Sequence, residues 1–220
     1  MDNIALTLKP LASHAKHRVF QRATIEGVLL LVLSLVVSYY AGVFAADHES
    51  FPVTDIILSN IRAFDVDWIF AYGPLLLWVF VAFLFLRRPQ YIPFTLKSIA
   101  LLILVRSVFV PLTHVGPFPV QAPLDYGNYF LQYFTSGADL FFSAHTALPF
   151  LMALLFWEDK KLRVFFTIVS ILFGVVVLLG HYHYSIDVLS AYFITFAVFR
   201  MGEILFHKEE RMFREGVGTA

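Results

Sequence analysis

The sequence predicts an all-α polytopic membrane protein, a bundle of six transmembrane helices. Of the 220 residues, 59% are hydrophobic and 15% are charged, whereas soluble domains carry about 25% charged residues. The apolar residues form long blocks, and a helix of about 20 such residues crosses a bilayer. Basic residues are concentrated in alternate links between these blocks, as expected for a chain that crosses the membrane repeatedly.

The first three predicted spans contain polar residues at different depths. They cover about 24–46, 68–86 and 94–112. Glu26 lies at the start of the first span, near the head groups, where a carboxylate is tolerated. The acidic link 47–67 contains apolar residues at a spacing that favours a short helix on the membrane surface. The third span places Arg106 deep inside the apolar block, so this side chain needs a partner or a function.

The last three predicted spans are joined by very short links. They cover about 140–157, 164–180 and 186–205. A charged turn at 158–163 separates the fourth span from the fifth, and only residues 181–185 separate the fifth from the sixth. Short links of this kind place consecutive helices side by side and antiparallel.

The distribution of basic residues predicts the orientation and the domains. The links 47–67, 113–139 and 181–185 contain a single arginine between them. We therefore expect a cytoplasmic N-terminal segment (1–23), a six-span membrane catalytic domain (24–205) and a cytoplasmic tail (206–220), with the active site on the non-cytoplasmic face. The formal net charge is zero, so no attraction to nucleic acid is expected. The chain contains no cysteine, which excludes disulfides and a thiol nucleophile.

Two histidine clusters fall at the non-cytoplasmic ends of spans four to six. His183 and Asp187 are four residues apart and would face each other at the start of a helix. A carboxylate there accepts the proton of one ring nitrogen and leaves the other free to attack phosphorus. His145, at the same depth, would protonate the departing alkoxide. This scheme predicts phosphoryl transfer through a phosphohistidine and needs no metal or cofactor.

The same residues allow other interpretations. Histidines at the ends of spans are often plain interfacial groups, and His181, His183 and Asp187 are also possible zinc ligands. Arg106 is either a charge paired with a neighbouring helix or an anion clamp. Three interpretations of Asp139 stay open: a solvated loop acid or helix cap, a contact for a cationic head group, and a residue that orients His181. Aromatic residues between 126 and 134 predict an interfacial belt, with stacking on a quaternary ammonium as the alternative.

Two motifs resemble a known family. Residues 138–146 read Ala-Asp-Leu-Phe-Phe-Ser-Ala-His-Thr, similar to the pattern Gly-Asp-x-x-x-Ser-Gly-His-Thr. Residues 183–188 read His-Tyr-Ser-Ile-Asp-Val and match His-Tyr-(Thr/Ser)-(Ile/Val)-Asp-Val without a gap. With these motifs the chain resembles the sphingomyelin synthase-like family within the type 2 phosphatidic acid phosphatase superfamily. The resemblance extends over about 52–196, where Pro52 and Asp55 match a Pro-x-x-Asp element.

The resemblance implies a function and a set of site residues. His145, His183 and Asp187 would form the catalytic triad, with His183 as the nucleophile. The expected substrate-binding residues are Arg106, Asp139, Ser143, His181 and Tyr184. The substrate would be a membrane phospholipid, whose phospho-head-group passes to ceramide, another alcohol or water while diacylglycerol is released.

Two departures from the family patterns leave alternatives open. Ala144 stands where the family has glycine, which favours a catalytically weakened lipid-binding relative. The further basic residues of the lipid phosphatases are absent, and Val177 occupies the place of one arginine. A single cation, Arg106, suits the one charge of a phosphodiester better than the two of a phosphomonoester. We therefore expect head-group transfer or phospholipase C-like cleavage, with lipid phosphatase action as the alternative.

Overall fold

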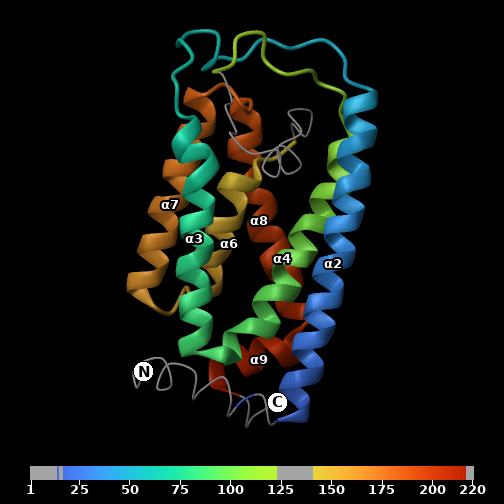
Figure 1. The fold of residues 1–220 in the computed structure, drawn as a ribbon, viewed down its shortest axis with the longest axis vertical. Coiled ribbons are helices and arrows are strands. Elements are labelled where there is room, and N and C mark those ends of the chain that lie inside the picture. The colour runs from blue at the N-terminus through green and yellow to red at the C-terminus, as the bar shows by residue number, and fades with distance from the viewer. Residues whose placement is uncertain (1–13, 15–16, 123–140, 217–220) are drawn as a thin grey trace.

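The chain folds into an elongated helical bundle, seen here in a computed structural model that describes residues 14, 17–122 and 141–216 (Figure 1). Every regular element among these residues is helical, so the predicted fold class is confirmed. The α-helices are α2 (Arg18–Asp47), α3 (Asp67–Arg87), α4 (Ile92–Phe109), α6 (Ala144–Leu155), α7 (Lys160–Leu179), α8 (Ser185–Leu205) and α9 (His207–Glu215). Two 3₁₀ turns, η1 (Pro89–Tyr91) and η2 (Val110–Leu112), flank α4.

Five of these segments are long and apolar enough to cross a membrane, and α6 is shorter than the predicted fourth span. Four of them are α2, α3, α7 and α8. The fifth is the stretch Pro89–Leu112, which consists of η1, α4 and η2. The 12 residues of α6 rise roughly 18 Å, about two thirds of a hydrocarbon core. The helix ends at Leu155 because the next residues form a turn in which Asp159 caps α7. The Asp159 carboxylate accepts hydrogen bonds from the Lys161 and Leu162 amides.

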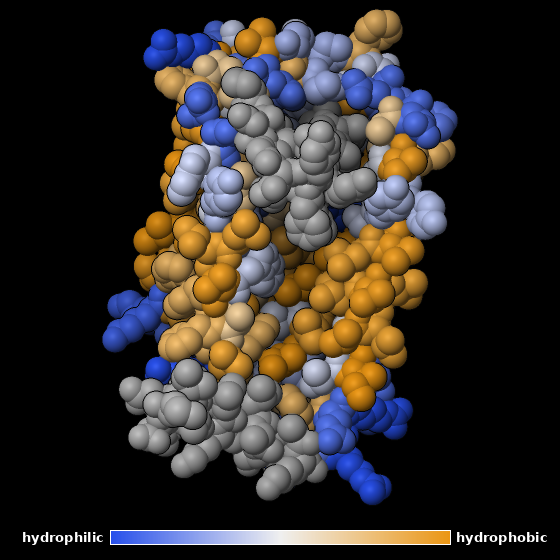
Figure 2. Space-filling model, viewed as in Figure 1, coloured by the Kyte–Doolittle hydropathy of each residue, from blue (hydrophilic) through white to orange (hydrophobic). Residues whose placement is uncertain are grey.

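The outer surface of the bundle is apolar along its middle and polar at both ends (Figure 2). Leu29, Val79 and Phe193 are 64–71% exposed, which is the arrangement expected of helices surrounded by lipid. Inside, α2 packs along α4, and α6 packs against both α7 and α8. The core between them contains fully buried Leu151, Met152 and Phe166, among others. This arrangement is that of a polytopic helical membrane protein.

The link between α2 and α3 forms a turn instead of the predicted surface helix. Residues 56–60 make hydrogen-bonded turns, and the Asp55 carboxylate accepts hydrogen bonds from the amides of Ile57 and Leu58. Leu58 is 2% exposed, whereas Ile56 is 82% exposed. Because residues 56–60 form turns, the apolar residues of this link do not line one helical face.

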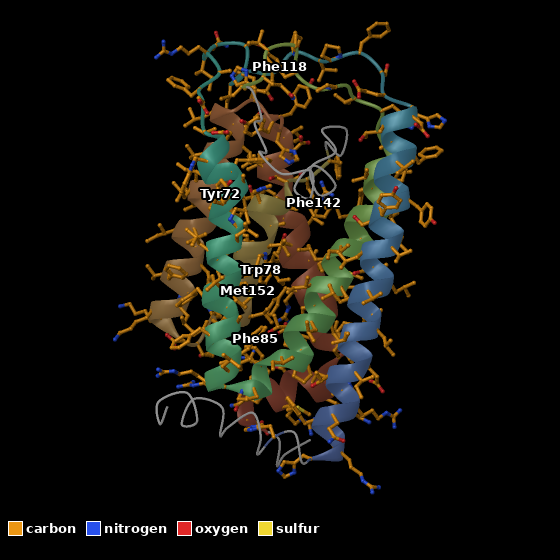
Figure 3. The ribbon with its side chains drawn as sticks, in the orientation of Figure 1. Tyr72, Trp78, Phe85, Phe118, Phe142 and Met152 are labelled. Atoms are coloured by element: carbon orange, nitrogen blue, oxygen red, sulfur yellow. The ribbon has the colours of Figure 1, made fainter. Side chains whose placement is uncertain are left out.

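The two ends of the bundle carry different groups. We call the end formed by the links 48–66 and 113–122 and the α7–α8 connection the histidine end. We call the opposite end, formed by η1, the α6–α7 link and α9, the basic end. In Figure 3, Phe118 and Phe142 lie toward the histidine end, and Phe85 lies toward the basic end.

Candidate active site

The two histidine motifs meet at the histidine end through the backbone. The amide of Ser143, the residue before α6, donates a hydrogen bond to the carbonyl oxygen of Asp187 in the first turn of α8, with the two atoms 3.1 Å apart. Close packing supports this contact, because a Cβ on Gly174 of α7 would lie 3.0 Å from Val188 and 3.4 Å from Thr146. The starts of α6 and α8 are thus held together.

His183 and Asp187 form a buried pair. Nδ1 of His183 lies 3.3 Å from Oδ2 of Asp187, and the same oxygen accepts a hydrogen bond from the Tyr184 amide at 3.0 Å. Both side chains are less than 9% exposed. The carboxylate fixes the tautomer with the proton on Nδ1, and within the described residues Nε2 has no hydrogen-bond partner. The Nδ1–Oδ2 distance exceeds that of a charge-assisted hydrogen bond, and such contacts tighten when substrate binds.

His145, the second residue of α6, is held by α3 and α7. Its Nε2 lies 3.2 Å from the carbonyl oxygen of Phe70, and its ring stacks on the Phe70 ring with centroids 4.2 Å apart. The rings of His145 and Phe173 meet edge to face, with their centroids 6.3 Å apart. A carbonyl oxygen only accepts, so the neutral ring carries its proton on Nε2. His145 can therefore deliver a proton from Nδ1 when it is an imidazolium.

Arg106 supports the backbone just before Ser143. Its Nε donates a hydrogen bond to the carbonyl oxygen of Phe142 at 3.1 Å, and the side chain is 7% exposed. Phe142 is fully buried and has a φ of 24°, a region that L-residues other than glycine rarely occupy. Arg106 thus stabilises a strained residue next to the site and brings a buried positive charge to the histidine end.

Two buried hydroxyls at the start of α6 are unsatisfied. Oγ of Ser143 and Oγ1 of Thr146 make no hydrogen bond within the described part of the chain, and both side chains are fully buried. Leaving a buried hydroxyl unpaired costs about 1–3 kcal/mol. Ser143 was predicted to contact substrate; Thr146 was not, although it follows His145 in the motif.

His181 and Tyr184 anchor loops. The Nδ1 of His181 lies 2.7 Å from the carbonyl oxygen of Val120, and its φ of 58° turns the chain sharply after α7. The hydroxyl of Tyr184 donates to the Gly116 carbonyl at 2.8 Å and accepts from the Val53 amide at 3.2 Å. Burial raises the pKa of the Tyr184 hydroxyl above its ordinary value. Both side chains expected to bind substrate thus hold the links 48–66 and 113–122 over α8.

Some of the predicted site residues belong to the segment 123–140. Asp139 and the aromatic residues between 126 and 134 lie outside the described residues.

For the zinc alternative, residues 14, 17–122 and 141–216 contain no group of three histidine or acidic side chains arranged to hold a metal. Ala144 takes a helical conformation as the first residue of α6 and is not among the residues of positive φ.

Asp55 is a site-supporting residue that the sequence indicated only weakly. Its Oδ2 accepts hydrogen bonds from the backbone amide and the hydroxyl of Ser185, both at 2.7 Å. Burial raises the pKa of the Asp55 carboxyl, but the hydrogen bonds from Leu58, Ser185 and Ile57 outweigh burial and hold it below its ordinary value. Ser185 is the first residue of α8, two positions before Asp187, so Asp55 fixes the helix end that carries the catalytic candidate.

Comparison with known proteins gives one family match. The model described as PAP2 superfamily C-terminal matches residues 137–204, a range that includes both histidine motifs. No curated protein and no solved structure matches the chain. The family match supports membership of the PAP2 superfamily and suggests a function of the lipid phosphatase or phosphotransferase type.

Proposed function

We propose that this protein is a membrane phospholipid head-group phosphotransferase or phospholipase C-like hydrolase, similar to the sphingomyelin synthases, with His183 as the nucleophile. The observation that supports it most is the buried His183–Asp187 pair at the start of α8, which leaves Nε2 of the imidazole available. The orientation predicted from the basic links would open this site to the non-cytoplasmic leaflet, with both termini in the cytoplasm.

The first step would transfer the head group to the enzyme. Nε2 of His183 attacks the phosphorus of the phospholipid, and a nitrogen–phosphorus bond forms as the bond to the glycerol oxygen breaks. That oxygen leaves with the electron pair and takes a proton from His145, releasing diacylglycerol. Asp187 accepts the hydrogen bond from Nδ1 and stabilises the positive charge that develops on the ring.

The second step would release the head group. His145, now neutral, accepts the proton of an incoming hydroxyl, whose oxygen attacks phosphorus while the nitrogen–phosphorus bond breaks. With ceramide or another alcohol as the acceptor the reaction is a transfer, and with water it is a hydrolysis. Oγ of Ser143 and Oγ1 of Thr146 have no hydrogen-bond partner within the described residues, and they would donate to the non-bridging phosphate oxygens.

The charge of the site favours a phosphodiester. Among the described residues, Arg106 is the buried cation at the histidine end, and Arg62, the other arginine there, is exposed and lies over the Phe64 ring. One buried positive charge matches the single negative charge of a phosphodiester lipid. A lipid phosphomonoester carries nearly two charges and would remain partly uncompensated.

The test is lipid mass spectrometry together with trapping of the intermediate. Purified protein supplied with phosphatidylcholine or phosphatidylethanolamine should release diacylglycerol, and radioactive head-group phosphate should become attached to the protein in an acid-labile form. His183→Ala should abolish both signals, and Asp187→Asn should lower kcat roughly 10⁴-fold. His48→Ala, which changes an exposed histidine at the same end, should leave both unchanged. Folded protein that releases no diacylglycerol from any glycerophospholipid contradicts the proposal.

Lipid phosphate phosphatase activity is the second candidate, because the family match itself is to the PAP2 superfamily. The same nucleophile and acid would act on phosphatidate or on an isoprenoid or sphingoid phosphate. Rapid release of inorganic phosphate from these lipids, with no diacylglycerol from phosphatidylcholine, selects this function over head-group transfer.

A further inference from the structure

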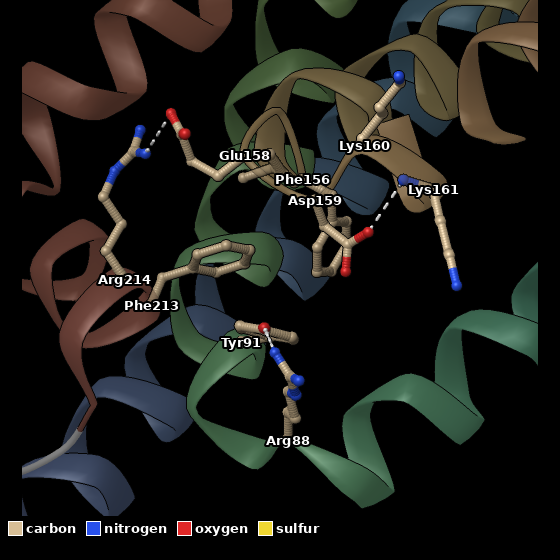
Figure 4. Close-up of a pocket in the computed structure, with 10 residues that line it drawn as sticks. Arg88, Tyr91, Phe156, Glu158, Asp159, Lys160, Lys161, Phe213 and Arg214 are labelled. Atoms are coloured by element: carbon tan, nitrogen blue, oxygen red, sulfur yellow. Dashed lines mark hydrogen bonds and ion pairs between the residues drawn. The ribbon is translucent and has the colours of Figure 1, made fainter. Parts of the chain in front are cut away.

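A second candidate site lies at the basic end, at the opposite end of the bundle from His183. It is a pocket of about 650 Å³, within the size range of small-molecule sites (Figure 4). Its walls come from segments far apart in the sequence: the residues around η1, the end of α6, the first residues of α7, and α9. The 20 residues of α7 separate it from the histidine end by roughly 30 Å.

The base of this pocket is aromatic. The rings of Tyr91, Phe156 and Phe213 contact one another, with centroids 4.4–5.3 Å apart. All three side chains are buried or nearly so. Nη1 of Arg88 donates a hydrogen bond to the Tyr91 hydroxyl at 2.8 Å, and the guanidinium lies 5.9 Å from the Tyr91 ring centroid. A positive charge is therefore held above an apolar base.

The rim of the pocket has an excess of positive charge. Arg214 is neutralised, since it forms ion pairs with Glu158, Glu203 and Glu210. Lys160 and Lys161 are exposed and have no ion-pair partner within the described residues. The remaining acid of the rim is Asp159, whose carboxylate already accepts two amides of α7.

The surroundings place the pocket at a membrane boundary. Trp157, which precedes the charged rim, is 49% exposed, and tryptophan is enriched where lipid head groups meet the hydrocarbon. The bias of basic residues toward one side of a membrane explains why α7 begins with two lysines. It does not explain why Arg88, beside η1, and the two lysines of α7 line one pocket with a shared aromatic base.

We propose that this pocket binds the head group of an anionic phospholipid from the leaflet at the basic end. The lipid phosphate would lie between Lys160, Lys161 and Arg88, and its glycerol backbone would lie over Tyr91 and Phe213. Basic pockets between transmembrane helices bind anionic head groups in this way. A lipid is favoured over a free phosphate ion because the aromatic base offers an apolar surface that an ion alone would not cover. The proposal does not depend on the chemistry at His183.

The test uses the full chain with His183→Ala, so that no lipid is consumed. The protein is placed in phosphatidylcholine nanodiscs containing phosphatidylglycerol, and retained lipid is measured by native mass spectrometry across phosphatidylglycerol concentrations. An ion pair between an exposed lysine and a phosphate bound in the pocket contributes up to about 1 kcal/mol. Lys160→Gln with Lys161→Gln should therefore weaken phosphatidylglycerol retention roughly 30-fold. Both lysines oppose the dipole at the start of α7, so these changes should not lower the melting temperature.

A matched control distinguishes binding in the pocket from general attraction between exposed cations and anionic lipid. Arg18→Gln with Arg87→Gln removes the same number of exposed cations from the same end, outside the pocket. This variant should retain phosphatidylglycerol as the parent does. Equal losses in both double variants, or equal retention of phosphatidylglycerol and phosphatidylcholine by the parent, overturn the proposal. Displacement of the bound lipid by millimolar inorganic phosphate would assign the pocket to a soluble anion, which also overturns it.

Discussion

The carboxylate of Asp55, in the link between α2 and α3, accepts two hydrogen bonds from Ser185, one from the amide and one from the hydroxyl, each 2.7 Å long. These bonds join segments 130 residues apart and cap the helix that carries Asp187. The other carboxylate oxygen accepts from Ile57 and Leu58, so a single side chain shapes its own link and fixes the start of α8.

Replacement of Asp55 should loosen the His183–Asp187 pair. Asp55→Ala removes an acceptor of four hydrogen bonds, and hydrogen bonds to charged groups contribute about 1.5–3 kcal/mol. We expect a lower melting temperature and a fall in kcat with little change in KM, because Asp55 positions the catalytic pair without contacting substrate. Ser185→Ala should have a smaller effect, since its amide still donates to Asp55. Equal kcat in Asp55→Ala and the parent would contradict this role.

Asp55 should also make the fold sensitive to acid. Its pKa is lowered in the folded protein, so its contribution to stability is complete above the unfolded value of about 3.9. The contribution is lost as the pH falls through the lower, folded pKa. The melting temperature should therefore decrease below about pH 4 in the parent and change less in Asp55→Asn. Parallel pH profiles of the two proteins would show that another group controls acid unfolding.

The sequence predicts well what depends on local spacing. Hydropathy located the helices, and the four-residue interval between His183 and Asp187 placed both side chains within contact distance. Each of these relations depends on residues that are near one another in the chain or on the regular rise of a helix.

The sequence could not predict contacts that depend on the tertiary fold. Asp55 caps α8 from 130 residues away, and no local sequence pattern indicates that Ser185 is its hydrogen-bond partner. The contacts of Tyr184 with the Gly116 carbonyl and of His181 with the Val120 carbonyl likewise have no local signal, while the role of both residues in substrate binding stays a prediction. The fourth span was predicted from composition at about 140–157, whereas α6 begins only at Ala144, after the extended residue Ser143, and ends at Leu155.

His145 should matter most when the leaving group is poor. As a general acid it protonates a departing glycerol alkoxide, which is a strong base, so His145→Ala should lower turnover of phosphatidylcholine roughly 10²–10⁴-fold. A phosphodiester with a p-nitrophenol leaving group needs no proton, so the same variant should be close to the parent on that substrate. His183→Ala should remain inactive on both. An equal deficit of His145→Ala on the two substrates would assign His145 to structure, through its contact with Phe70.

A buried charge cluster at the basic end should hold α9 against the bundle. Nζ of Lys97 lies 2.9 Å from Glu26 of α2 and 2.7 Å from Glu209 of α9, and the lysine side chain is 9% exposed. Lys97→Met leaves Glu209 without its cation, which should cost about 2–3 kcal/mol, less than a fully buried pair because Glu26 is partly exposed.

The Lys97 prediction can be measured by hydrogen exchange of the α9 amides together with the melting temperature. Lys97→Met should accelerate exchange in α9, and adding Glu209→Gln should restore part of the protection because the uncompensated charge is removed. Lys208→Met, which changes an exposed lysine of α9, serves as the control. Unchanged α9 exchange in Lys97→Met would show that Met212 and Phe213, which are buried, hold the helix alone.

Ala144→Gly should not increase activity, although glycine occupies this position in the family that the chain resembles. Ala144 is helical, and the strained residue of this motif is Phe142, at a φ of 24°. Alanine therefore fits the backbone here, and glycine would add conformational freedom costing up to about 0.5–1 kcal/mol. We expect the variant to release diacylglycerol with the same kcat as the parent and to have a slightly lower melting temperature. A severalfold gain in kcat would mean that the Ala144 methyl group obstructs the phosphate, and that this chain is a weakened enzyme.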